Sequence, residues 1–155
     1  MVILGIDPGI ATTGYAVIRK VRSGVQPVDW GIIETKKNQQ LAGRLQTISE
    51  DLERLIKKYR PGLAVVELVY FAKNAKTAIN VAQARGVVLL TLRKQKIKIL
   101  ELTPLQVKSG VVGYGAASKQ QVQFMIKKLM NLKSTPKPDD AADALSLAYC
   151  GLTKK

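Results

Sequence analysis

The chain has 155 residues, of which 46% are hydrophobic and 23% are charged, as in a globular domain and unlike a disordered chain. It contains no histidine, which excludes serine triads, HExxH zinc sites and histidine general bases. A single cysteine, Cys150, cannot close an intrachain disulfide, so we expect a reducing, cytoplasmic setting and one domain over residues 1–155.

The charge balance favours an anionic partner. The chain carries 25 Lys and Arg against 11 Asp and Glu, a formal net charge of +14. Nucleic acid is the first candidate partner and an anionic membrane surface the second, while a purely solubilising surface or association with the ribosome stays open. The apolar run from Val2 to Ile6 meets Asp7 far short of the ~20 residues that a membrane span needs, so we expect no membrane partner.

The first part of the chain predicts three strands joined by short connections. Residues 2–6 form a continuous apolar run, which is typical of a strand buried on both faces. Two further strands are predicted over 14–21 and 28–35, with Gly24 and Pro27 as turn-like residues between them. The short connections predict an antiparallel meander.

The rest of the chain predicts alternating helices and strands. Helical periodicity over 41–59 is stopped by Pro61, and a short buried strand follows over 63–66. Because a helix joins the two strands, we expect 63–66 to run parallel to 2–6. The other predicted elements are a helix over 74–94, a strand over 97–102, helices opening near Leu105 and at Ser118 as N-cap, and a helix over 139–149. This order predicts an α/β fold with a mixed five-stranded sheet flanked by helices.

Four acidic residues stand at positions that favour a shared site. Asp7 and Glu67 end the two strands predicted to be parallel, so both emerge at the carboxyl edge of the sheet. Asp140 and Asp143 are spaced i, i+3 on one face of the last helix, among small alanines that let the helix lie close to a sheet. The acids that we place at solvent-facing or cap-like positions are Asp29, Glu34, Glu50, Asp51, Glu53 and Asp139.

Four crowded carboxylates predict a bound cation. Their mutual repulsion and desolvation are costly without one, and oxygen ligands suit Mg²⁺, for which Mn²⁺ can substitute. Two ions ~4 Å apart would activate a water and stabilise the leaving oxygen in phosphodiester hydrolysis. Taken singly, Asp7 is also compatible with an Asx turn, Glu67 with a surface charge, and Asp140 and Asp143 with a helix N-terminus. The loop from Asp7 to Gly14 also resembles a phosphate loop of actin-like ATPases, although those folds need two lobes.

Several motifs occur in an order and spacing that match a known family. They are residues 5–18 (GIDPGIATTGYAVI), Val66-Glu67, 71–78, 83–87, 103–108, 112–115, Ser118-Lys119, 121–125 and 138–145 (PDDAADAL). With this set the chain resembles the RuvC family of bacterial Holliday junction resolvases, the crossover junction endodeoxyribonucleases, over almost its whole length. The resemblance implies an RNase H-like (integrase-like) fold, a homodimer, and magnesium-dependent cleavage of four-way DNA junctions in recombination and repair. Branch-migration proteins RuvA and RuvB are partners implied by the family alone.

The resemblance also assigns roles to single residues. Asp7, Glu67, Asp140 and Asp143 fall on the family's metal-binding carboxylates, although some relatives have His at the last position. Lys108 and Lys119 fall on basic positions near the cleaved strand. Tyr70 falls on an aromatic position, often Phe, that contacts bases at the junction centre. The residues that follow it and are expected at the DNA backbone are Lys73, Asn74 and Lys76.

Some expectations stay open at this point. Arg85 lies in a shared motif, where it could contact DNA or pack its helix. The apolar residues of 74–94 suit either a core or a dimer seam. A junction-binding protein without turnover, and a related RNase H-like nuclease acting on RNA, are the alternatives to the resolvase.

Overall fold

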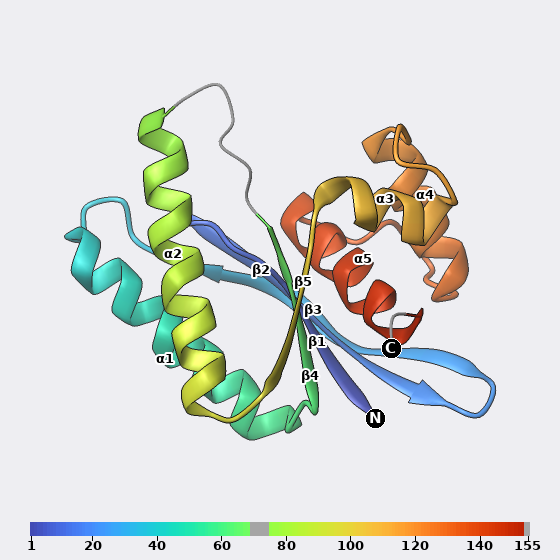
Figure 1. Ribbon diagram of the computed structural model, residues 1–155, viewed down its shortest axis with the longest axis horizontal. Helices are drawn as coiled ribbons and strands as arrows, with labels where there is room; N and C mark the ends of the chain where they lie inside the picture. The colour runs from blue at the N-terminus through green and yellow to red at the C-terminus, as the bar shows by residue number, and fades with distance from the viewer. Residues whose placement is uncertain (69–74, 154–155) are drawn as a thin grey trace.

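The computed structural model describes residues 1–68 and 75–153, except for the side chains of residues 75 and 76 (Figure 1). The elements are β1 (Val2–Asp7), β2 (Thr12–Val21), β3 (Gly24–Glu34), α1 (Leu41–Tyr59), β4 (Leu63–Glu67), α2 (Ala75–Lys94), β5 (Lys98–Leu102), α3 (Pro104–Val112), α4 (Lys119–Leu129) and α5 (Asp139–Thr153).

The five strands form one mixed sheet in the order β3-β2-β1-β4-β5. The first three strands are antiparallel, whereas β4 runs parallel to β1 and β5 runs parallel to β4. This confirms the predicted meander and the predicted crossover. Figure 1 shows α1 and α2 on one face of the sheet and α3, α4 and α5 on the other.

Two apolar cores lie on the two faces of the sheet, and strand alternation decides which residue enters which core. In β1, Leu4 and Ile6 pack with α1 and α2, while Ile3 packs with α5. Gly5, next in the same alternation as Ile3, lies directly under the backbone of Ala144 in α5. Because Asp7 follows Gly5 by two residues, its side chain is directed to the α5 face at the end of the strand.

Helix α5 packs on the sheet at very short range. A Cβ atom at Gly5 would collide with the carbonyl oxygen of Ala144, and one at Gly14 would collide with the carbonyl oxygen of Asp140. Small residues on both partners therefore permit the approach, as the alanines of the last predicted helix suggested. The first turn of α5 is thereby held against the ends of β1 and β2.

The prediction that Pro27 lies in a turn before a strand starting at Val28 is wrong. Strand β3 starts at Gly24, and Pro27 pairs with Ile18 beside a register shift between Val17 and Ile18. Proline is tolerated there because β3 is the edge strand of the sheet and the ladder is irregular at that point.

The last helix is longer than predicted. It continues to Thr153 and does not end at Tyr149, because Gly151 is still buried against the sheet and Cys150 against α3. Among the described residues, no helix combines the length and apolar character that crossing a membrane requires.

Candidate active site

Two carboxylates lie next to each other at the carboxyl edge of the parallel strands. Ile6 of β1 pairs with Val66 of β4, so Asp7 and Glu67 stand one residue further along at the same level. Both side chains are half-buried and face α5.

Helix α5 adds the other two carboxylates. Ligand oxygens of Asp7, Asp140 and Asp143 all lie within 4.8 Å of one another. The hydroxyl of Thr12 donates a 2.6 Å hydrogen bond to Oδ2 of Asp140, which fixes the orientation of that carboxylate. Of the four sequence-predicted acids, Asp7, Asp140 and Asp143 form this close group, and Glu67 stands beside Asp7 at the end of the neighbouring strand.

The loop after Asp7 is closed by its own hydrogen bonds. The hydroxyl of Thr13 donates to the carbonyl oxygen of Gly9 at 2.7 Å, and the Gly9 N–H donates back to Thr13 Oγ1 at 3.3 Å. The hydroxyl of Thr35 also donates to the carbonyl oxygen of Ile10, at 2.5 Å. These contacts return the chain from β1 to Thr12 and hold the latter beside α5.

The electrostatics of the cluster favour a bound cation. Burial, followed by the charges of Glu67, Asp143 and Asp140, raises the pKa of Asp7 from 3.8 to about 8. Burial, followed by the charge of Asp143, raises the pKa of Glu67, and burial also raises the pKa of Asp143. A cation bound among these carboxylates would offset both their burial and their mutual repulsion. The donor atoms that converge here are carboxylate oxygens, which fit a hard divalent ion.

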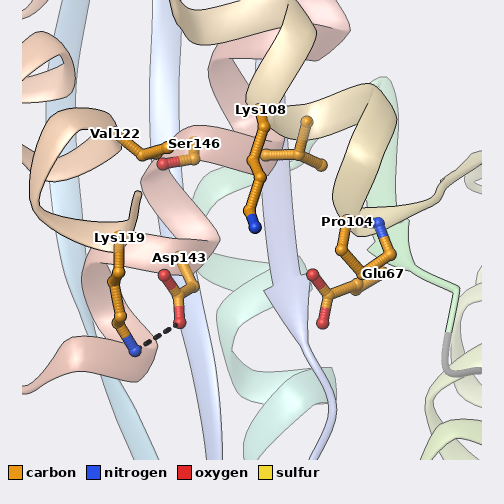
Figure 2. A pocket seen from close by; sticks show the side chains of 8 residues that line it. Glu67, Pro104, Lys108, Lys119, Val122, Asp143 and Ser146 are labelled. Atoms are coloured by element: carbon orange, nitrogen blue, oxygen red, sulfur yellow. Dashed lines mark hydrogen bonds and ion pairs between the residues drawn. The ribbon is translucent and has the colours of Figure 1, made fainter. Parts of the chain in front are cut away.

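A pocket of about 220 Å³ adjoins the cluster and is lined by Glu67, Asp143, Lys108 and Lys119, together with Pro104, Val107, Val122 and Ser146 (Figure 2). In Figure 2 the Lys108 side chain points toward the space between Asp143 and Glu67. The two lysines that the sequence placed near the cleaved strand therefore both face the site.

Local sequence explains where these lysines stand. Thr103 and Gln106 form a reciprocal capping box at the start of α3, with Pro104 at the first helical position. Ser118 and Gln121 form the same motif at the start of α4, which confirms Ser118 as the N-cap. Lys119 is consequently the first residue of α4.

Lys119 is held between two carboxylates. Its Nζ lies 3.2 Å from Oδ2 of Asp143 and 3.3 Å from Oδ2 of Asp139. Burial lowers the pKa of Lys119, but the two carboxylates outweigh burial and the pKa is raised. Asp139, which we placed at a solvent-facing or cap-like position, is thus exposed but paired.

The side chains of four predicted DNA-contact residues are not described by the structure. Tyr70, Lys73 and Asn74 lie outside the described residues, and Lys76 is placed only by its backbone, in the first turn of α2. Arg85 forms an ion pair with Glu101 of β5, with 22% of its side chain exposed. In the described chain Arg85 therefore ties α2 to the edge of the sheet.

Sequence reasoning missed Thr12, Gln123 and the pairing of Asp139. The amide of Gln123 donates to Oδ1 of Asp139 at 3.2 Å. A usable signal was present: Lys119 and Gln123 are spaced i, i+4, as are Asp139 and Asp143, so each pair shares a helix face.

Comparison with known proteins places this geometry in a family. Residues 3–151 match the family model described as "Crossover junction endodeoxyribonuclease RuvC". The chain belongs to the RuvC family. Crossover junction endodeoxyribonucleases RuvC of Halothermothrix orenii and Petrotoga mobilis are each 51% identical over 150 residues, covering 97% of this chain and 91% and 92% of theirs.

A solved RuvC structure shares the fold. The structure of Thermus thermophilus RuvC in complex with a Holliday junction substrate superposes with a TM-score of 0.91 at 29% identity. The match covers 97% of this chain and 92% of that one. It confirms the RNase H-like fold with a mixed five-stranded sheet.

Proposed function

We propose that this RuvC family member resolves four-way DNA junctions by metal-dependent hydrolysis of phosphodiester bonds. The observation that carries the proposal is the convergence of Asp7, Glu67, Asp140 and Asp143 in a chain of net charge +14. The positive charge of the protein attracts the polyanionic DNA, and the carboxylates of the pocket would bind the cations that the hydrolysis requires. Function in homologous recombination and repair, with RuvA and RuvB, follows from the family alone.

The four carboxylates are the proposed metal ligands. Bound divalent ions would activate the attacking water and stabilise the leaving oxygen. The described ligand groups are hard oxygens without nitrogen or sulfur, so we propose Mg²⁺ in the cell, with Mn²⁺ able to substitute. Thr12 keeps Asp140 oriented toward the other carboxylates, and the loop hydrogen bonds of Thr13 and Gly9 keep Thr12 in place.

Lys108 and Lys119 are proposed to contact phosphates of the cleaved strand. Both line the pocket beside Glu67 and Asp143, so a phosphate entering it meets their ammonium groups. Tyr70 is proposed to stack on a base at the junction centre, for which alanine substitution would cost about 1–3 kcal/mol of binding. The proposed contacts to the DNA backbone are Lys73, Asn74 and Lys76.

The exposed face of α2 is the proposed dimer seam. Ile79 and Leu90 each have 56% of their surface exposed, and a Cβ atom added at Gly86 between them would meet no atom within 4 Å beyond its own stretch of helix. The three positions fall within about 40° of one another on a helical wheel, so they form one stripe pointing away from the sheet. A two-fold dimer would place one active site on each of two opposite strands of the junction.

Substrate competition tests the proposed function. A labelled mobile four-way junction is incubated with the protein with and without Mg²⁺, against unlabelled junction, linear duplex or RNA–DNA hybrid. We expect paired, symmetric nicks that need Mg²⁺ and that only unlabelled junction suppresses at low excess. Binding without nicks would favour the non-cleaving alternative, and suppression by hybrid above all would favour an RNA-directed nuclease.

A further inference from the structure

Helices α4 and α5 meet through four polar side chains at the rim of the carboxylate cluster. Lys119 contacts Asp143 and Asp139, and Gln123 donates to the second oxygen of Asp139. Figure 2 shows the Lys119 side chain extending from α4 to Asp143, at one side of the pocket. We refer to Lys119, Gln123, Asp139 and Asp143 as the α4–α5 clasp.

The two acids of the clasp, Asp139 and Asp143, differ in exposure and in the direction of their side chains. The Asp143 side chain is 32% exposed, and its carboxylate lies within 4.8 Å of ligand oxygens of Asp7 and Asp140. The Asp139 side chain is 64% exposed and is turned toward α4, where Lys119 and Gln123 lower its pKa through hydrogen bonds. Although Asp139 and Asp140 are consecutive, they point in different directions because neighbours on a helix differ by about 100°.

The Lys119 ammonium group is therefore shared between Asp143, a proposed metal ligand, and Asp139, which is not one of the proposed ligands. We infer that Asp139 is a positioning residue: its ion pair with Lys119 keeps that side chain at the rim of the site when Asp143 binds a metal ion. The inference rests on the proposed metal site and assigns a role to a residue beyond the four ligands.

The reason lies in competition for Asp143. The Lys119 ammonium group and a divalent cation compete for the carboxylate of Asp143, so the Lys119–Asp143 ion pair must weaken before the metal is fully bound. With Asp139 present, Lys119 moves toward a second carboxylate already fixed by Gln123. Without Asp139, Lys119 has Asp143 as its remaining partner in the clasp, and metal binding must break that pair. Asp139 thus favours metal binding while keeping the ammonium beside the substrate pocket.

A double-mutant cycle on metal binding tests this. Mn²⁺ alone is titrated calorimetrically into DNA-free wild type, Asp139→Asn, Lys119→Met and the double variant at constant salt. We expect Asp139→Asn to raise the Mn²⁺ dissociation constant about two- to fivefold, the range that an exposed ion pair supports, and to have little effect in the Lys119→Met background. Lys119→Met alone should tighten Mn²⁺ binding, because it removes the competing ammonium.

An equal loss of affinity in both backgrounds would overturn the inference, because Asp139 would then act only through its own charge. No loss in either background would overturn it as well. Gln123→Ala, which keeps the net charge, should also raise the Mn²⁺ dissociation constant. Asp139→Glu, which keeps a carboxylate at this position, should bind Mn²⁺ more tightly than Asp139→Asn and close to the wild type. Asp51→Asn, at a half-buried acid paired with Arg54 on α1, is the charge-matched control and should leave binding unchanged.

Failure of this inference is distinguishable from failure of the proposed function. If Asp7→Asn abolishes Mn²⁺ binding while the cycle shows no coupling, the metal site stands and the positioning role of Asp139 does not. If Asp7→Asn binds Mn²⁺ as the wild type does, the proposed metal site itself is refuted.

Discussion

The hydroxyl of Thr12 is the group through which β2 orients the carboxylates of the proposed metal site. It donates to Asp140 at 2.6 Å from a strand position directly beside the first turn of α5. Thr12→Val keeps the shape of the side chain and removes the donor. Because partners of metal-binding groups typically contribute ten- to a hundredfold to metal affinity, we expect Mn²⁺ affinity to fall by about tenfold.

Calorimetric titration of Mn²⁺ into Thr12→Val and Thr12→Ser checks this expectation. The serine variant retains the hydroxyl and should bind like the wild type. Equal affinities for all three proteins would show that Asp140 needs no orienting partner.

The raised pKa of Asp7 predicts an unusual dependence of stability on pH. Without metal, the folded chain keeps a proton on Asp7 up to about pH 8, while the unfolded chain loses it near 3.8. The folded state therefore binds more protons in this window, so Asp7 makes the free energy of unfolding fall as pH rises from 4 to 8. Glu67 and Asp143, whose pKa values are also raised, act in the same direction.

Urea unfolding of wild type and Asp7→Asn in a metal chelator measures this effect. The variant should exceed the wild type in unfolding midpoint by more at pH 8 than at pH 5, because the asparagine cannot ionise. The same difference at both pH values would mean that Asp7 does not titrate in this window.

At the scale of elements, the site depends on how closely α5 approaches β2. Gly14→Ala would place a methyl group against the carbonyl oxygen of Asp140, and backbone atoms cannot rotate away as a side chain can. We expect a loss of about 1–3 kcal/mol in the free energy of unfolding, together with weaker metal binding as Asp140 is displaced.

The matched control for Gly14→Ala is Gly62→Ala, at a position where a Cβ meets no atom within 4 Å and φ is not positive. Urea unfolding of both variants provides the comparison. Unchanged stability in Gly14→Ala would contradict the tight packing of α5 on the sheet.

Elements with a strong periodic pattern could be predicted from the sequence, and so could the acids at their ends. The helix over 41–59 has its predicted bounds, and the parallel pairing that sets Asp7 beside Glu67 follows from one crossover. Pro27 was misjudged because only the strand order shows that β3 is an edge. The i, i+4 spacings show which residues of α4 and of α5 share a face, but the pairing of Asp139 also depends on how α4 docks on α5, which those spacings do not specify.

At the scale of the molecule, the active site and the proposed dimer seam lie on opposite sides of the sheet. The stripe of Ile79, Gly86 and Leu90 belongs to α2, while α4 and α5 cover the other face (Figure 1). Leu90→Glu would bury a charge in the seam, which is costly when unpaired. We expect the variant to sediment as a folded monomer at concentrations where the wild type is a dimer.

Phe124→Glu is the control for oligomeric state, because Phe124 is an equally exposed apolar residue, at 57%, on α4. It should remain dimeric in the ultracentrifuge. A wild type that is monomeric throughout the micromolar range, or a dimeric Leu90→Glu, would refute the proposed seam.

The most direct test of the metal-cluster account compares wild type with Asp7→Asn on a mobile four-way junction. Junction binding is measured in Ca²⁺ and cleavage in Mg²⁺, with folding of the variant verified by circular dichroism. The account predicts that both proteins bind the junction with similar affinity and that only the wild type nicks it. Nicking by Asp7→Asn at the wild-type rate, or by the wild type in the presence of a metal chelator, would contradict it.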